Sequence, residues 1–136
     1  MNKDRFITTP LVSCQSVNGN LFVQWFESNR FEDRTRDETL EVIARVLDEL
    51  KDTRVNIVVD LTHMPVSFAY RHLSRCVSYM RNCSGWDAAQ RSVRVVTGSK
   101  LLSWVLNSFA DVKRSVFVGT VDAACSDLGL DASLFL

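Results

Sequence analysis

The sequence lacks the short motifs that identify most enzymes. Its 136 residues contain no phosphate-binding loop, no glycine-rich dinucleotide-binding turn, no paired-histidine metalloprotease motif and no hydrolase nucleophile elbow. A hydrolase triad would have to use His63 or His72, the two histidines of the sequence, and neither lies in a recognisable nucleophile context. We therefore expect a protein that is not an enzyme.

Charge and apolar length are also limited. Sixteen basic and sixteen acidic residues cancel, so no field of the whole domain gathers nucleic acid or anionic lipid, and no nucleic-acid partner is expected. The longest apolar runs are far shorter than the about 18 residues of a membrane-spanning helix, and residues 1–5 lead into no signal-peptide core. These absences predict a cytoplasmic protein without a transmembrane segment.

The four cysteines, Cys14, Cys76, Cys83 and Cys125, show no C-x-x-C spacing. Two of them lie inside expected helices, which suits reduced intracellular thiols better than a disulfide framework or a zinc cluster. His72 and Cys76 have the i, i+4 spacing of two metal ligands on one helix face, yet no third ligand is evident. We expect structural cysteines, no metal and no cofactor.

What the sequence does contain is a regular alternation of strand and helix patterns from residue 55 onward. Each β-branched run of the kind found in buried strands is followed by an apolar stripe at helical spacing. This alternation predicts an α/β fold with parallel strands and right-handed connections, in a single domain covering 1–136. The expected strands are 55–59, 92–96 and 115–118, and the expected helices are 67–81, 100–113 and a short one from about residue 122.

The N-terminal third predicts a hairpin followed by a helix. Asn18 and Gly19 separate two strand-like runs, 11–17 and 21–26, and this pair readily adopts the positive φ angles of a tight hairpin turn. Thr35 and Glu38 fit a capping box, so the helix is expected to start at Thr35. The stripe expected to face the sheet is Leu40, Ile43, Ala44, Leu47 and Leu50.

The two central helices carry the surfaces of interest. In the first, a polar side opposite the buried stripe can meet an anion or an acidic partner, although a merely solvated helix face is the alternative. In the second, Leu101 and Trp104 add apolar bulk beside the core stripe, so this helix is either deeply buried or docks on something, which makes the two residues candidates for a homodimer contact. The polar side of the first helix comprises Arg71, Arg75, Ser78 and Asn82, and its buried stripe comprises Leu73, Cys76, Val77 and Met80. The core stripe of the second helix comprises Leu102, Val105, Leu106 and Phe109.

Polar residues also follow the expected strands. Asp60 ends one strand near His63, at the edge of the sheet where open α/β folds bind ligands. The amides of the helix that follows the next strand can hold a carboxylate or a phosphate. The alternatives are that Asp60 only receives loop amides and that His63 is a satisfied loop histidine, or, as a weaker hypothesis, that the two act as acid and base. The candidate ligand site is Asp60, His63, Thr97, Gly98 and Ser99.

The order of elements resembles the STAS domain, which is shared by anti-sigma-factor antagonists and the cytoplasmic tails of sulphate transporters. Residues 56–62 look like the central strand of that family, residues 95–109 like its next strand and helix, and residues 118–124 like its closing strand and last helix. The likeness covers residues 8–130. It implies a mixed central sheet with an N-terminal antiparallel hairpin, three to four helices largely on one side, and a regulatory kinase or signalling protein as partner.

The turn after the central strand departs from the family pattern. Antagonists of this family carry a phosphorylated serine or threonine in an Asp-Ser-Ser-Gly-like turn, whereas residues 64–71 here lack that signature. If a phosphorylation site exists, Ser67 is the first choice and Thr62 the second; a serine that only caps the helix is the alternative.

The sequence therefore predicts a non-enzymatic STAS-like domain that binds another protein. Its working surface is expected to run from Thr62 to Ser67 and onto Arg71, Arg75 and Ser78. A domain that binds a small molecule or an anion at the strand ends is the alternative. A flat surface at the strand ends would favour the first function, and a pocket would favour the second.

Overall fold

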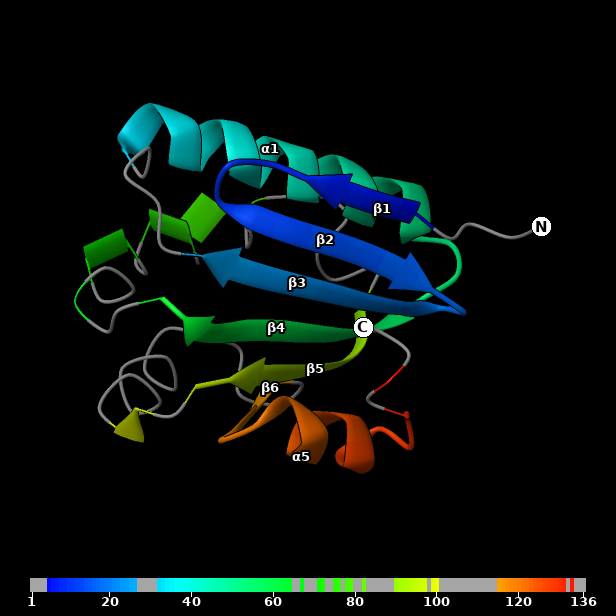
Figure 1. Cartoon of the computed structure of the whole chain (residues 1–136). Coiled ribbons are helices and arrows are strands. Elements are labelled where there is room, and N and C mark those ends of the chain that lie inside the picture. The colour runs from blue at the N-terminus through cyan, green and yellow to red at the C-terminus, as the bar shows by residue number, and fades with distance from the viewer. Residues whose placement is uncertain are drawn as a thin grey trace.

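The computed structural model describes residues 5–26, 32–64, 67, 71, 72, 75, 76, 78, 79, 82, 90–97, 99, 100, 115–131 and 133. These residues form an α/β arrangement with a sheet between helical layers (Figure 1). The elements are β1 (Arg5–Thr8), β2 (Val12–Val17), β3 (Asn20–Phe26), α1 (Asp33–Leu50), β4 (Val55–His63), β5 (Gln90–Val96), β6 (Ser115–Val118) and α5 (Val121–Asp127).

Within the described residues the sheet has six strands in the order of the chain, β1-β2-β3-β4-β5-β6. The β1–β2 and β2–β3 pairs are antiparallel, and the β3–β4, β4–β5 and β5–β6 pairs are parallel. The predicted mixed sheet and the parallel pairing of its three later strands are thus confirmed. Strand β1 was not predicted.

The predicted hairpin joins β2 and β3. Asn18 and Gly19 have φ angles of 50° and 77°, which are the two positive values that a type I′ turn requires. The side-chain amide of Asn20 donates to the carbonyl oxygens of Val17 at 3.3 Å and Asn18 at 3.1 Å. The turn is therefore held by the side chain of the residue that follows it as well as by backbone pairing.

Helix α1 starts earlier than the sequence predicted. Its N-cap is Glu32, and the first helical hydrogen bond runs from the Arg36 amide to the Glu32 carbonyl oxygen at 2.9 Å. Thr35 lies inside the first turn, where its hydroxyl contacts a Glu32 carboxylate oxygen at 3.4 Å, and Glu38 accepts from Arg34 at 3.1 Å. The prediction of a Thr35–Glu38 capping box was therefore wrong, because the helix begins two residues before Thr35. The acidic residue Asp33 suits this earlier start, since a negative charge is favourable at the positive end of a helix.

One face of the sheet packs against α1. The predicted stripe is buried at Leu40, Ile43, Leu47 and Leu50, whereas Ala44 is only half-buried. Val46 joins this stripe. Because successive side chains of a strand point to opposite faces, the same core takes alternate strand residues: Leu21, Val23, Trp25, Val55, Ile57 and Val93.

The opposite face packs against α5. Phe22, Val58 and Val96 come from three neighbouring strands and are buried together with Ala124 and Cys125 of the helix. Figure 1 shows α1 and α5 on opposite sides of the sheet. The two helices that are described in full thus lie one on each face.

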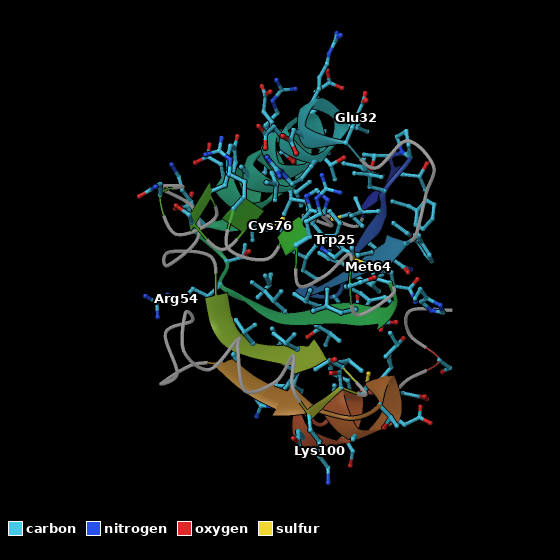
Figure 2. All side chains as sticks on the ribbon, turned by 90° about the vertical axis from the view of Figure 1, so that its left-hand side faces the viewer. Trp25, Glu32, Arg54, Met64, Cys76 and Lys100 are labelled. Carbon is cyan, nitrogen blue, oxygen red and sulfur yellow. The ribbon has the colours of Figure 1, made fainter. Side chains whose placement is uncertain are left out.

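Helical residues between β4 and β5 belong to the α1 side. Cys76 and Tyr79 pack against the same core as α1, and Figure 2 shows Cys76 on that side of the sheet together with Trp25 and Met64. We call the described helical residues here, Ser67, Arg71, His72, Arg75, Cys76, Ser78 and Tyr79, the second helical segment. Several predicted positions lie outside the described residues: Leu73, Val77, Met80, Cys83, Gly98, Leu101, Leu102, Trp104, Val105, Leu106 and Phe109.

Candidate functional site

Asp60 is the buried centre of the predicted strand-end site. Its exposed fraction is 1 %, and both carboxylate oxygens have partners. One oxygen accepts from the backbone amide of Thr62 at 2.9 Å and from its hydroxyl at 2.6 Å. The other accepts from the side-chain amide of Gln24 at 3.2 Å. A buried carboxylate with three donors is well placed to fix the end of β4.

His63 lies beside this carboxylate at the surface. Its Nε2 atom is 3.6 Å from the second oxygen of Asp60, beyond hydrogen-bond distance, and its side chain is 52 % exposed. The ring packs against Phe26 of the neighbouring strand, with ring centroids 5.4 Å apart. The structure thus brings Asp60, Thr62 and His63 together, and holds His63 mainly by the aromatic contact.

The end of β5 supplies the other part of this predicted site. Thr97 is buried and follows Val96, the register partner of Asp60 in β4. The Thr97 hydroxyl accepts from the Ser99 amide at 3.2 Å, so that amide is already used within the loop. Gly98, the third member of the prediction, lies outside the described residues.

The second predicted surface lies on the second helical segment. Ser67, Arg71, Arg75 and Ser78 are all exposed, and we call these four residues the outer face. His72, Cys76 and Tyr79 of the same segment are buried or half-buried, and Cys76 and Tyr79 pack against the core. The helical residues therefore separate into a polar outer side and an inner side that packs on the protein.

Arg36, which the sequence patterns above did not single out, links this segment to α1. Its side chain is only 9 % exposed and contacts two carboxylates of its own helix, Asp33 at 3.2 Å and Asp37 at 3.1 Å. Asp37 in turn lies 3.5 Å from Arg75 of the outer face. Partial burial acts to raise the pKa of Asp37, but the hydrogen bonds from Arg36 and Arg75 keep this pKa below its ordinary value.

The same guanidinium group reaches the buried histidine. One terminal nitrogen of Arg36 lies 3.1 Å from Nδ1 of His72. Burial lowers the pKa of His72 below its ordinary 6.5; the guanidinium groups of Arg36 and Arg71 lower it further, and Asp33 opposes them. The signal that could have revealed this contact is the position of Arg36, which lies on the helical stripe that continues to Thr39, Leu40 and Ile43.

The inner thiols are not arranged for chemistry. Burial raises the pKa of Cys14 to about 12 and that of Cys76 to about 11, so the nucleophilic thiolate is scarce at neutral pH. Across the described residues, no three His, Cys, Asp or Glu side chains come together in a group that could hold a metal ion. His72 and Cys76 therefore have no third ligand in this part of the chain.

Comparison with known proteins adds no family to this picture. No protein-family model matches the sequence, and no curated protein matches it. In the described part of the chain, no helix combines the length and apolar character needed to cross a membrane.

Proposed function

We propose that this chain is a STAS-like, non-enzymatic regulatory domain that binds another protein through the outer face, Ser67, Arg71, Arg75 and Ser78. The observation that carries the proposal is the separation of exposed polar and inward residues within one helical segment. The element order supports the likeness, because an antiparallel hairpin leads into a run of parallel strands. A cytoplasmic location belongs to the same proposal.

The outer face suits an acidic partner. Arg71 and Arg75 are one helical turn apart and both exposed, so one carboxylate-bearing segment can reach both guanidinium groups. Arg75 lies 3.5 Å from Asp37, at a pair of partly exposed groups, and such surface pairs contribute little energy. A partner carboxylate can therefore replace Asp37 at small cost.

Among the two hydroxyls proposed for phosphorylation, Ser67 is the better supported. It is exposed within the second helical segment and precedes Arg71 by four residues. The Thr62 hydroxyl, by contrast, donates to Asp60 at 2.6 Å. A phosphate on Thr62 would lose this bond and lie beside a buried carboxylate, which repels it.

The alternative, an anion site at the strand ends, has less support. The buried Asp60 carboxylate contributes negative charge there, and the Ser99 amide already donates to Thr97. Both features disfavour an anionic ligand at the described residues. An acid–base enzyme built on Asp60 and His63 is also less favoured, because Asp60 already accepts three hydrogen bonds.

The test is capture of partners from the source cell with the wild-type protein and with a double charge reversal, Arg71→Glu with Arg75→Glu. The matched control is Arg45→Glu with Lys51→Glu, which changes the net charge equally at exposed positions of α1 and just beyond it. We expect the first double variant to bind a captured partner at least about tenfold more weakly, while each exposed substitution changes the free energy of unfolding by under about 0.5 kcal/mol.

A phosphomimetic variant completes the test. Ser67→Asp should change the affinity for the same partner if phosphorylation is the switch, because it adds charge beside Arg71. Equal binding by the wild type and the Arg71→Glu, Arg75→Glu protein would reject the outer face as the working surface.

A further inference from the structure

Two groups that repel each other when both are charged lie in contact beneath the outer face. Arg36 and His72 are both buried, with exposed fractions of 8 % and 4 %. Their closest nitrogen atoms, an Nη1 of Arg36 and Nδ1 of His72, are 3.1 Å apart. A guanidinium group has donors only, so Nδ1 of His72 is the acceptor and the ring proton is on Nε2. The contact thus requires a neutral imidazole.

Charged groups of α1 and of the second helical segment surround this contact. From α1, Asp37 accepts from Nε of Arg36, and Asp33 accepts from Nη1, the same nitrogen that contacts His72, so that Asp33 acts to raise the pKa of His72. From the second helical segment, the positive charge of Arg71 lowers the pKa of His72. Arg75 of the same segment lies 3.5 Å from the Asp37 carboxylate. Cys76, on the inner side of the same segment, is held in its neutral form by a pKa raised to about 11. A proton on Nδ1 of His72 would therefore remove the acceptor for Arg36 and bring two buried cationic groups into contact.

We propose that Arg36 and His72 form an acid-sensitive latch, which holds the second helical segment against α1 while His72 is neutral and releases that segment when His72 is protonated. The identification of the released surface as a binding surface rests on the proposed function. The latch itself rests on the Arg36–His72 contact. Because Arg71 directly precedes His72 and Arg75 follows it by three residues, movement of His72 changes the placement of both outer-face arginines.

The direction of the pH effect follows from linkage. The pKa of His72 is lower in the folded protein than its ordinary 6.5, so the unfolded or released state binds more protons. The stability that the neutral His72 contributes to the folded state is therefore fully present above the ordinary pKa of 6.5. This contribution is lost as the pH falls toward the folded-state pKa. Aspartates ordinarily titrate near about 3.9, so a range from about pH 7.5 to about pH 5 tests the histidine with little carboxylate titration.

The experiment uses the free wild-type protein with protons as the only ligand. Nitrogen-detected NMR of the two imidazoles gives the tautomer and pKa of His72, and amide hydrogen exchange gives local protection. We expect the Nε2–H tautomer, a pKa below 6.5, and protection factors at Arg71, His72 and Arg75 that fall at least about tenfold more than those of β3 and β4 between the two pH values.

Two variants separate the latch from general acid sensitivity. His72→Gln keeps an acceptor for Arg36 but cannot be protonated, so its second helical segment should stay protected at about pH 5. His63→Gln removes the exposed histidine and should keep the wild-type acid response. A His72 pKa at or above 6.5, a proton on Nδ1, or an equal loss of protection in wild type and His72→Gln would overturn the proposal.

These results are independent of any partner. An acid response with the expected His72 dependence supports the latch even where charge reversal of Arg71 and Arg75 leaves partner binding unchanged, which rejects only the binding surface. Binding that depends on Arg71 and Arg75 with no acid response of the second helical segment rejects the latch and leaves the proposed function in place.

Discussion

Asp60 and Thr62, which are separated by one residue at the end of β4, are joined by two hydrogen bonds. One oxygen of the Asp60 carboxylate accepts both from the Thr62 amide at 2.9 Å and from the Thr62 hydroxyl at 2.6 Å. The second oxygen bonds to Gln24 of the adjacent strand. The buried charge therefore joins two neighbouring parallel strands and shapes the turn that leaves one of them.

Removing the Thr62 hydroxyl should measure this contact. Thr62→Val keeps the side-chain shape and the backbone donor, so we expect a loss of about 1 kcal/mol in the free energy of unfolding. Asp60→Asn should cost more, about 2 kcal/mol, because a charged acceptor of three hydrogen bonds becomes neutral and one of its acceptor atoms becomes a donor. Urea denaturation measures both. A Thr62→Val midpoint equal to that of the wild type would show that the hydroxyl bond has no net effect.

The start of α1 leaves room for a stabilising substitution. Glu32 is the N-cap, with an extended backbone at φ −131° and ψ 169°, and its side chain makes no capping hydrogen bond. Glu32→Asp supplies a shorter carboxylate of the preferred capping type, so the free energy of unfolding should rise by about 0.5–1 kcal/mol.

The contrasting variant is Thr35→Ala, which removes the hydroxyl group of the residue that the sequence pattern predicted as the N-cap. Because Thr35 lies inside the first turn, this change should stay within about 0.5 kcal/mol of the wild type. A loss of about 1 kcal/mol on chemical denaturation would instead indicate that Thr35 acts as a cap in solution.

Gly19 should resist substitution for a purely conformational reason. An added Cβ would meet no atom within 4 Å, but residues with a side chain rarely adopt a φ angle of 77°. Gly19→Ala is therefore expected to lower the free energy of unfolding by about 1 kcal/mol. Gly119→Ala is the matched control, because its surroundings are equally open and its φ lies outside the left-handed region; it should change stability by under about 0.5 kcal/mol. Equal effects of the two variants would contradict the turn geometry.

Cys14, which is buried, and Cys76, which is half-buried, should react only when the protein opens. With pKa values raised to about 12 and about 11, Cys14 and Cys76 have little thiolate at pH 8. We expect alkylation of both, followed by mass spectrometry of the peptides, to be at least about a hundredfold slower in the folded protein than in denaturant. Rapid labelling of Cys14 in the folded state would contradict its burial. A rise in rate with pH is expected, because the thiolate fraction grows toward each pKa.

The strands that the sequence predicted are those whose pattern is local and strong. Strand-like runs rich in β-branched residues predicted β4, β5 and β6, and Asn18 with Gly19 predicted the hairpin. Each of these local patterns favours one backbone geometry without reference to a distant part of the chain. Strand β1 has four residues, Arg5–Thr8. Strand β6 is equally short, but it completes the repeated alternation of strand and helix patterns; β1 belongs to no such repeat, and its strand conformation depends on pairing with β2.

The candidate site shows the same limit. Helical spacing placed Arg71, Arg75 and Ser78 on one polar side, and these residues are exposed, but their role in binding remains a prediction. The Arg36–His72 contact joins residues 36 positions apart. A single sequence shows that Arg36 continues a buried stripe, but it does not show which segment packs against that stripe.

The strand order has a consequence for synthesis. Each strand pairs with the strand that precedes it in the chain, so a nascent chain emerging from the ribosome can extend the sheet at one growing edge. Among the described strands, none has to insert between two that are already paired. Vectorial folding of this kind keeps the loop closures short, and the β2–β3 hairpin, complete after Phe26, is the earliest sheet nucleus on which the parallel strands can add.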